Sequence, residues 1–143
     1  NYKKVGDYGL TDGIKGSLNF GDDTWMGWSG NNLDVVVDMD SSVAIQYLQL
    51  NCLQQTQSWI LLPKKVEFFI SDDGENWKQL TTQTHNIPDD EFKPLVYEFS
   101  YRIPIAMKAR YIRAVATNYG KLPGWHNGAG GQAWIFADEL IVR

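Results

Sequence analysis

Short segments of alternating polar and apolar side chains, separated by turn residues, most constrain what this chain can fold into. Residues 65–71 and 133–142 alternate with the period of a strand, and Asp72–Asn76 follows the first as a hairpin connection. Residues 43–53 would also fit a helix, but no capping residue precedes them and strands flank them. We expect a turn at residues 40–42. The pattern predicts an all-β sandwich with strands at residues 33–39, 43–53, 65–71, 77–80, 95–103, 110–117 and 133–142. Residues 2–5 are expected to form a short edge segment, and residues 25–28 a short aromatic strand or a loop edge.

Length and charge limit the class of protein. We interpret residues 1–143 as a single module, because this length suffices for one domain with its own core. The formal net charge is −4 and no basic stripe occurs, which argues against nucleic acid or an anionic membrane as partner. No apolar run approaches the ~20 residues of a membrane span. The single cysteine, Cys52, cannot form an internal disulfide and is expected to be a buried thiol.

The start of the chain and its aromatic content suggest a wider context. The chain begins at Asn1 without a methionine or a signal peptide, so we expect a piece of a larger protein or a mature form. It contains six Trp, seven Tyr and six Phe. This load exceeds what a core of this size needs, and the surplus suggests an aromatic binding face.

The loop of residues 120–132 is the strongest candidate for a binding surface. Five glycines and Pro123 exclude a helix or a continuous strand there, and Trp125 and His126 lie in the middle. A glycine-rich loop that presents an aromatic ring and an imidazole beside a rigid strand is suited to binding. The alternative is a long sandwich loop whose Trp packs back on its own domain.

Four motifs occur in order along the chain: Thr11-Asp12-Gly13 with Ser17, Ser71–Trp77, Ala109–Arg113 and Ala137–Val142. Together they resemble the discoidin, or coagulation-factor type C, domain, and within it the carbohydrate-binding modules of family 32. The resemblance covers nearly the whole chain. Within the family, the chain looks most like the modules at the C-terminus of gut-bacterial glycoside hydrolases, notably β-N-acetylhexosaminidases. It implies a discoidin-like jelly-roll sandwich of about eight main antiparallel strands, with ligand bound by loops at one end. Leu122–His126 and Gln132–Phe136 are the segments most similar to the hydrolase modules.

The same resemblance implies a structural calcium ion that ties the two chain ends together. Calcium takes six to eight oxygen ligands, many of them carbonyls. The matching side chains are Asp12, Ser17 and Glu139, with backbone oxygens near Gly9 and Asp138. A polar ligand that some members carry two residues after the aspartate is replaced here by Ile14, so that oxygen would come from the backbone.

A sugar site needs an aromatic platform for the C–H face of the ring and directional polar groups for its hydroxyls. Galactose-binding family members use a His, an Arg and an Asn, and the matching positions here are Met26, Gln54 and Gln57, so all three depart from that pattern. This leaves open a different sugar, a different site or no sugar. We expect Trp25, Trp77 and Trp134 in the core. The candidate carbohydrate-binding residues are Trp28, Gln54, Gln57, Trp59, Trp125, His126 and Asn127.

No catalytic constellation is apparent. Asp138 and Glu139 are adjacent acids, as in some hexosaminidases, but neighbouring residues of a strand point to opposite faces. The chain is also too short for the (β/α)₈ barrel of those enzymes, typically ~250 residues. The Asp89–Glu91 run indicates a solvated acidic loop. We therefore expect an accessory module and not an enzyme.

The leading hypothesis is a non-catalytic glycan-binding module that tethers an attached glycoside hydrolase, of the β-N-acetylhexosaminidase type, to its substrate. The expected ligands are galactose- or N-acetylhexosamine-type sugars, and the expected location is secreted, periplasmic or on a bacterial cell surface. Two alternatives stay open. The module either packs on a catalytic neighbour without binding sugar, or it is a protein- or lipid-binding discoidin domain, which its acidic charge opposes for anionic lipid.

Overall fold

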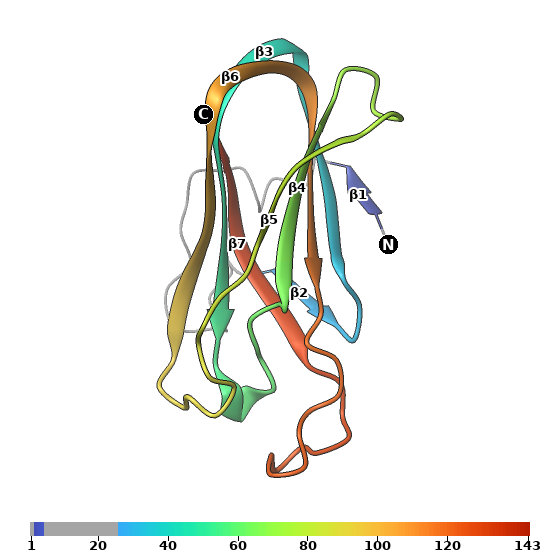
Figure 1. Ribbon diagram of the computed structural model, residues 1–143. Coiled ribbons are helices and arrows are strands. Elements are labelled where there is room, and N and C mark those ends of the chain that lie inside the picture. The colour runs from blue at the N-terminus through green and yellow to red at the C-terminus, as the bar shows by residue number, and fades with distance from the viewer. Residues whose placement is uncertain (1, 5–25) are drawn as a thin grey trace.

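The computed structural model describes residues 2–4 and 26–143, and this part of the chain is built almost entirely of β-strands (Figure 1). The all-β prediction is therefore confirmed, including a strand where residues 43–53 also fitted a helix. Besides one 3-10 turn, η2 (Thr56–Ser58), the elements are β1 (Tyr2–Lys4), β2 (Met26–Ser29), β3 (Leu33–Gln54), β4 (Lys65–Ser71), β5 (Lys78–Gln83), β6 (Leu95–Thr117) and β7 (Trp134–Val142).

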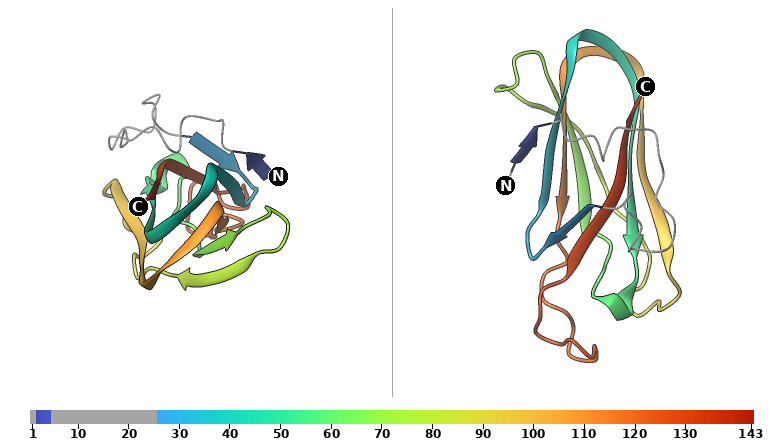
Figure 2. Two further views of the ribbon diagram at one scale, coloured as in Figure 1. Left: turned by 90° about the horizontal axis from the view of Figure 1, so that it is seen from above. Right: turned by 180° about the vertical axis from the view of Figure 1, so that it is seen from behind.

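Two long bent strands, β3 and β6, organise the sheet. They pair antiparallel from Leu33 opposite Ala116 to Gln54 opposite Leu95, and they arch together over one end of the molecule (Figures 1 and 2). The strand order is β2-β7-β3-β6-β4-β5, with β1 parallel to β3 and the other pairs antiparallel. Because β4 pairs with the second half of β6 and β7 with the second half of β3, the sheet folds over on itself into a sandwich.

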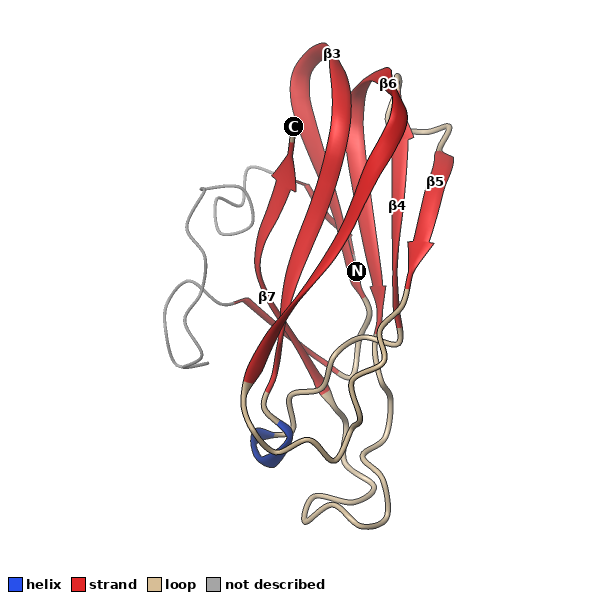
Figure 3. Ribbon diagram, turned by 60° about the vertical axis from the view of Figure 1, so that its left-hand side comes forward, coloured by secondary structure: helices blue, strands red, loops and turns tan. Residues whose placement is uncertain are grey.

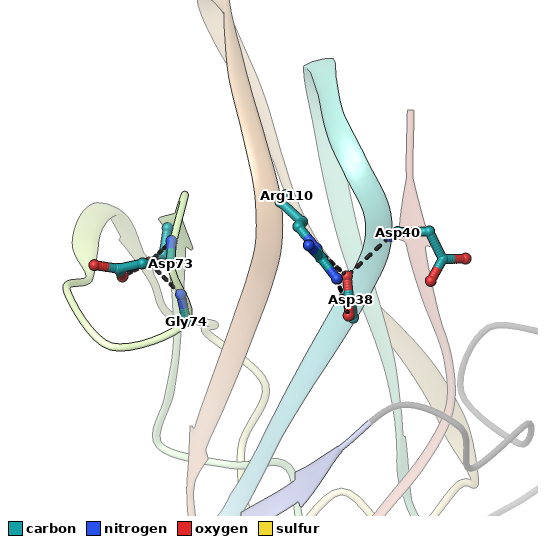
Figure 4. A network of polar contacts seen from close by, with 6 residues as sticks. Asp38, Asp40, Asp73, Gly74 and Arg110 are labelled. Carbon is teal, nitrogen blue, oxygen red and sulfur yellow. Dashed lines mark hydrogen bonds and ion pairs between the residues drawn. The ribbon is translucent and has the colours of Figure 1, made fainter.

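The turn predicted at residues 40–42 is wrong, because β3 runs through it. The pairing with β6 shifts register between Asp38 and Val43, which is an irregularity of the β-bulge type that bends the strand without ending it. Asp40 takes a φ of 69°, and its backbone N–H donates to Asp38 Oδ1 at 2.9 Å. Arg110 of β6 donates from Nε and Nη2 to the two carboxylate oxygens of Asp38 at 2.8 and 3.0 Å, which joins the two strands at the bend (Figure 4).

The break predicted between residues 103 and 110 is likewise absent, since β6 is continuous there. Its pairing with β3 lapses between Arg102 and Met107, and Pro104 falls in this gap. A proline there removes no ladder hydrogen bond, because no partner faces its missing N–H. Two pairs of predicted strands thus form two bent strands, so the nine predicted segments correspond to seven strands in the described residues.

The core fills the space between the two faces of the folded sheet. Phe68 of β4, Leu50 of β3 and Ile135 of β7 are all fully buried in one cluster, so both faces contribute. Cys52 is the buried free thiol that the sequence predicts. Its burial raises the pKa of the thiol, and the nearby Asp138 carboxylate raises it further.

The prediction that Trp134 belongs to the core is wrong. Its side chain is 37% exposed and lies edge-to-face with Phe136 at 5.8 Å, whereas Ile135 and Ala137 are buried. The alternation in β7 was correct, but it does not say which of the two faces points inward. Trp77 is half-buried with Arg113 over its ring, and Trp25 lies outside the described residues. Among the described residues, no helix has the length and apolar character needed to cross a membrane.

Candidate functional site

Three loops gather at the end of the sandwich opposite the bend of β3 and β6 (Figure 3). The first, residues 55–64, leaves β3 and contains η2. The second, residues 84–94, enters β6, and the third, residues 118–133, joins β6 to β7. All three meet at one end because β3 ends, β6 begins and β7 begins there.

The 118–133 loop is held by its own backbone hydrogen bonds. Leu122 N–H donates to Gly131 O at 2.8 Å and Ala133 N–H donates to Gly120 O at 2.9 Å, so the base of the loop is a short antiparallel ladder. At its tip, His126 N–H donates to Pro123 O at 3.0 Å and closes a turn around Trp125. The loop therefore presents Trp125 from a folded support, and its indole is 49% exposed.

A hollow of about 440 Å³ lies between these loops, a volume within the usual range of small-molecule sites. Phe92 and Trp125 form its aromatic part, with ring centroids 5.9 Å apart and planes at 76°, and Phe92 is 47% exposed. The described residues that line it include no carboxylate and no ammonium group, so its polar groups are neutral amides and an imidazole. The lining is Gln57, Phe92, Trp125, His126 and Asn127.

His126 is buried and both of its ring nitrogens contact backbone groups. Its Nδ1 accepts from Gly128 N–H at 2.8 Å, so this nitrogen carries no proton. Its Nε2 must then carry the proton and donates to Thr56 O. His126 therefore lines the hollow with its ring while its polar atoms join the 118–133 loop to η2.

Two further buried side chains fix the 84–94 loop. Gln54 Nε2 donates to Pro88 O at 2.9 Å, and Thr56 Oγ1 lies 3.0 Å from both Asp89 O and Glu91 O. Gln54 and Thr56 are essentially inaccessible to solvent. The loop that carries Phe92 is thus attached to the end of β3, which fixes one wall of the hollow.

Trp59 has a supporting position beside the hollow. It adopts a left-handed backbone conformation, with a φ of 68°, and directs its indole onto the backbone of the 118–133 loop. A Cβ at Gly131 would lie 2.7 Å from Trp59 Cζ3, and one at Gly128 would overlap the same indole. Glycine at these two positions therefore makes room for the Trp59 ring.

The seven candidate sugar-binding residues thus separate into two groups. Gln57, Trp125, His126 and Asn127 line the hollow together. The Gln54 side chain points into the domain, Trp59 packs under the 118–133 loop, and Trp28 packs against the core. Sequence reasoning misses Phe92, because the acidic run before it indicates only a solvated loop; an aromatic residue in that loop was the available signal.

The residues expected to hold calcium are mostly not described. Gly9, Asp12, Ile14 and Ser17 lie outside the described residues, and for Glu139 only the backbone, within β7, is described. Asp138 is fully buried. In residues 2–4 and 26–143, no three His, Cys, Asp or Glu side chains gather as a metal-binding group.

Several solved structures with a similar fold are carbohydrate-binding modules. A family 32 module from a family 31 glycoside hydrolase of Clostridium perfringens is 16% identical, with a TM-score of 0.56 over 93% of this chain and 80% of that one. The family 32 module of AlyQ, in complex with 4,5-unsaturated mannuronic acid, is 13% identical, with a TM-score of 0.57 over 95% and 84%. A pectin-binding module is 17% identical, with a TM-score of 0.52 over 95% and 78%.

No curated protein matches the chain. A family model does match it: the model of the F5/8 type C domain covers residues 4–136, nearly the whole sequence. With the folded-over β-sandwich already described, this match identifies the chain as a member of the F5/8 type C domain family.

Proposed function

We propose that this domain is a non-catalytic glycan-binding module whose binding site is the hollow beside Trp125. The observation that carries the proposal is the pairing of two half-exposed aromatic rings, Phe92 and Trp125, with the neutral amides of Gln57 and Asn127. Aromatic faces stack on the C–H patches of a sugar ring, and side-chain amides both donate to and accept from hydroxyls. Among the described residues that line the hollow there is no acid pair, which argues against hydrolysis at this site.

The fold neighbours support the same function. The AlyQ module was solved with an unsaturated mannuronic acid, and another neighbour is described as pectin-binding. As far as the structure describes the lining of the hollow, it holds no ammonium or guanidinium group for a carboxylate, so we propose neutral sugars of the galactose or N-acetylhexosamine type. We further propose that the module is secreted or surface-exposed and tethers an attached glycoside hydrolase, of the hexosaminidase type, to its substrate.

Titration calorimetry with galactose, N-acetylgalactosamine, N-acetylglucosamine and N-acetyllactosamine tests the proposal. A shallow site of this kind is expected to have a Kd of about 10⁻⁴–10⁻³ M, or about 4–6 kcal/mol of binding free energy. Trp125→Ala and Phe92→Ala should abolish measurable binding, whereas Ile105→Ala, an exposed apolar residue outside this hollow, should not. Absence of heat with every sugar at high concentration would contradict glycan binding.

One observation favours a second candidate, a structural domain that packs on its catalytic neighbour. Gln54 and His126, two of the expected sugar-binding groups, use their polar atoms on backbone carbonyls and N–H groups of the domain itself. In that case Trp125 and Phe92 would be covered by the neighbour. Trp125→Ala in the full-length protein would then lower its stability without changing its retention on polysaccharide.

We also propose a structural calcium ion bound by the side chains of Asp12, Ser17 and Glu139 and by backbone oxygens near Gly9 and Asp138. These hard oxygen donors suit calcium. Met26, which follows the segment with Asp12 and Ser17, pairs with Ala137, the residue before Asp138. Chelation with EDTA should lower Tm and added calcium should restore it, while Asp12→Asn should make Tm insensitive to EDTA. An unchanged Tm in EDTA would rule out the ion.

A further inference from the structure

A second hollow, of about 270 Å³, lies at the same end of the sandwich. Leu61 and Leu62 of the first loop and Ile87 of the second give it an apolar floor, and both leucines are almost fully buried. Lys64, Asp89 and Tyr119 add a cation, an anion and a phenol to its lining. Unlike the first hollow, it carries charged side chains, and an apolar surface combined with a few polar groups is typical of a small-molecule site.

The same three loops line both hollows. The 84–94 loop contributes Phe92 to the first hollow and Ile87 and Asp89 to the second. The 118–133 loop contributes Trp125 to the first and Tyr119 to the second. The contacts of Gln54 and Thr56 with the carbonyls of residues 88, 89 and 91 fix the loop that serves both hollows. A ligand held in the first hollow therefore has the second within the same loop cluster.

The polar groups of the second hollow are arranged to contact hydroxyls. Tyr119 O–H donates to Asp89 Oδ2 at 2.6 Å, and this bond raises the pKa of Tyr119 to about 12, so the phenol stays neutral. The bond uses Oδ2 of Asp89 and leaves Oδ1 as an acceptor for a ligand. The side chain of Lys64 is exposed and supplies N–H donors. One carboxylate acceptor and one ammonium donor above an apolar floor can bind a sugar ring through its hydroxyls and its C–H face.

We propose that the second hollow is a subsite for a further sugar unit, so that the ligand class is a neutral oligosaccharide. Asp89 Oδ1 accepts from a hydroxyl of this unit, Lys64 Nζ donates to another, and Tyr119 with Ile87 contacts its apolar face. The inference rests on the proposed sugar binding at the first hollow. It adds that affinity rises with chain length, because the second unit gains contacts that a monosaccharide does not make.

The test compares chain lengths on the whole domain. The probes are N-acetylglucosamine with its β-1,4-linked dimer and trimer, and galactose with its β-1,4-linked dimer and trimer, in calorimetric titrations. For the sugar type that binds, the trimer should bind about tenfold more tightly than the monomer. Lys64→Ala should remove most of this gain and leave monomer affinity as it was, whereas Trp125→Ala should abolish binding of both.

Chemical-shift mapping with the same probes separates the two proposals. The monomer should shift backbone amides near Gln57 and Trp125, and the trimer should also shift those of Lys64, Asp89 and Tyr119. If no probe shifts any amide, the proposed function itself fails. If monomer and trimer bind equally and shift the same amides, the first hollow binds sugar and the second is not a subsite. The Tm of Lys64→Ala checks that the variant is folded.

Discussion

At the scale of single residues, two neighbouring side chains of the 118–133 loop have different roles. His126 is buried and joins the loop to η2 through both ring nitrogens, whereas Asn127 is exposed and lines the hollow. His126→Ala should leave the Thr56 carbonyl and the Gly128 N–H without their partner and lower the free energy of unfolding by ~1–3 kcal/mol. Urea unfolding measures this, and acrylamide quenching of tryptophan fluorescence should report a looser loop.

Asn127→Ala is the matched control for that prediction. The change removes an exposed amide from the hollow, so we expect weaker sugar binding and an unfolding free energy within about 0.5 kcal/mol of the wild type. If both variants are equally stable, His126 does not hold the loop. If Asn127→Ala is the less stable of the two, the division of tasks between these neighbours is wrong.

His85 predicts a pH dependence of stability. Partial burial lowers the pKa of the His85 imidazole below the ordinary 6.5. The Nδ1 of His85 accepts from Ile87 N–H at 2.9 Å, and protonation of Nδ1 would remove this bond. Between the two pKa values the unfolded chain binds more protons, so stability should fall as the pH drops below 6.5. Urea midpoints of wild type and His85→Asn between about pH 7.5 and about pH 5 test this. The wild type should lose more stability; parallel curves would contradict it.

At the scale of elements, the conformation of the 118–133 loop depends on the Trp59 indole beneath it. Gly128→Ala would place a methyl group inside that ring, so the loop and Trp59 must separate. We expect a loss of ~1–3 kcal/mol in stability and weaker sugar binding, as for other overpacked sites. Gly124→Ala is the control in the same loop, because a Cβ there has no atom within 4 Å. Similar Tm values for the two variants would show that Trp59 does not support the loop.

The elements also show where sequence reasoning succeeds and where it stops. Alternation is sufficient to predict β4 and β7, because a strand with one buried face has apolar side chains at every second position. The bend of β3 was not predictable in this way. Asp40-Ser41-Ser42 has turn composition, but the strand pairs with β6 on both sides of it and Arg110 binds Asp38 at the bend.

For the site, the sequence supplies the residue types but not their directions. Gln54 and Gln57 are chemically alike and three residues apart, yet one amide binds the carbonyl of Pro88 and the other lines the hollow. The distinction depends on the 84–94 loop, which is remote in sequence. Phe92 reaches the hollow for the same reason, through contacts of its loop with Thr56 that no local pattern encodes.

At the scale of the whole molecule, β3 and β6 join the two faces of the sandwich. The first half of β3 pairs with the second half of β6, which also pairs with β4. The second half of β3 pairs with β7. The pairs β4–β5 and β2–β7 each join this sheet only through β6 or β3, so both faces depend on the same two bent strands. The three loops of the candidate site are positioned by both faces, because β3 ends there and β6 and β7 begin there.

This connectivity predicts that the sandwich unfolds as one cooperative unit. Phe68, fully buried on β4, contacts a core shared with β7, so Phe68→Ala should lower the free energy of unfolding by ~3–5 kcal/mol. Native-state hydrogen exchange should show that the slowest amides of β4 and of β7 lose this same amount, because both exchange through global unfolding. If the β7 amides keep their wild-type protection while those of β4 lose it, the two faces unfold separately and the bent strands do not couple them.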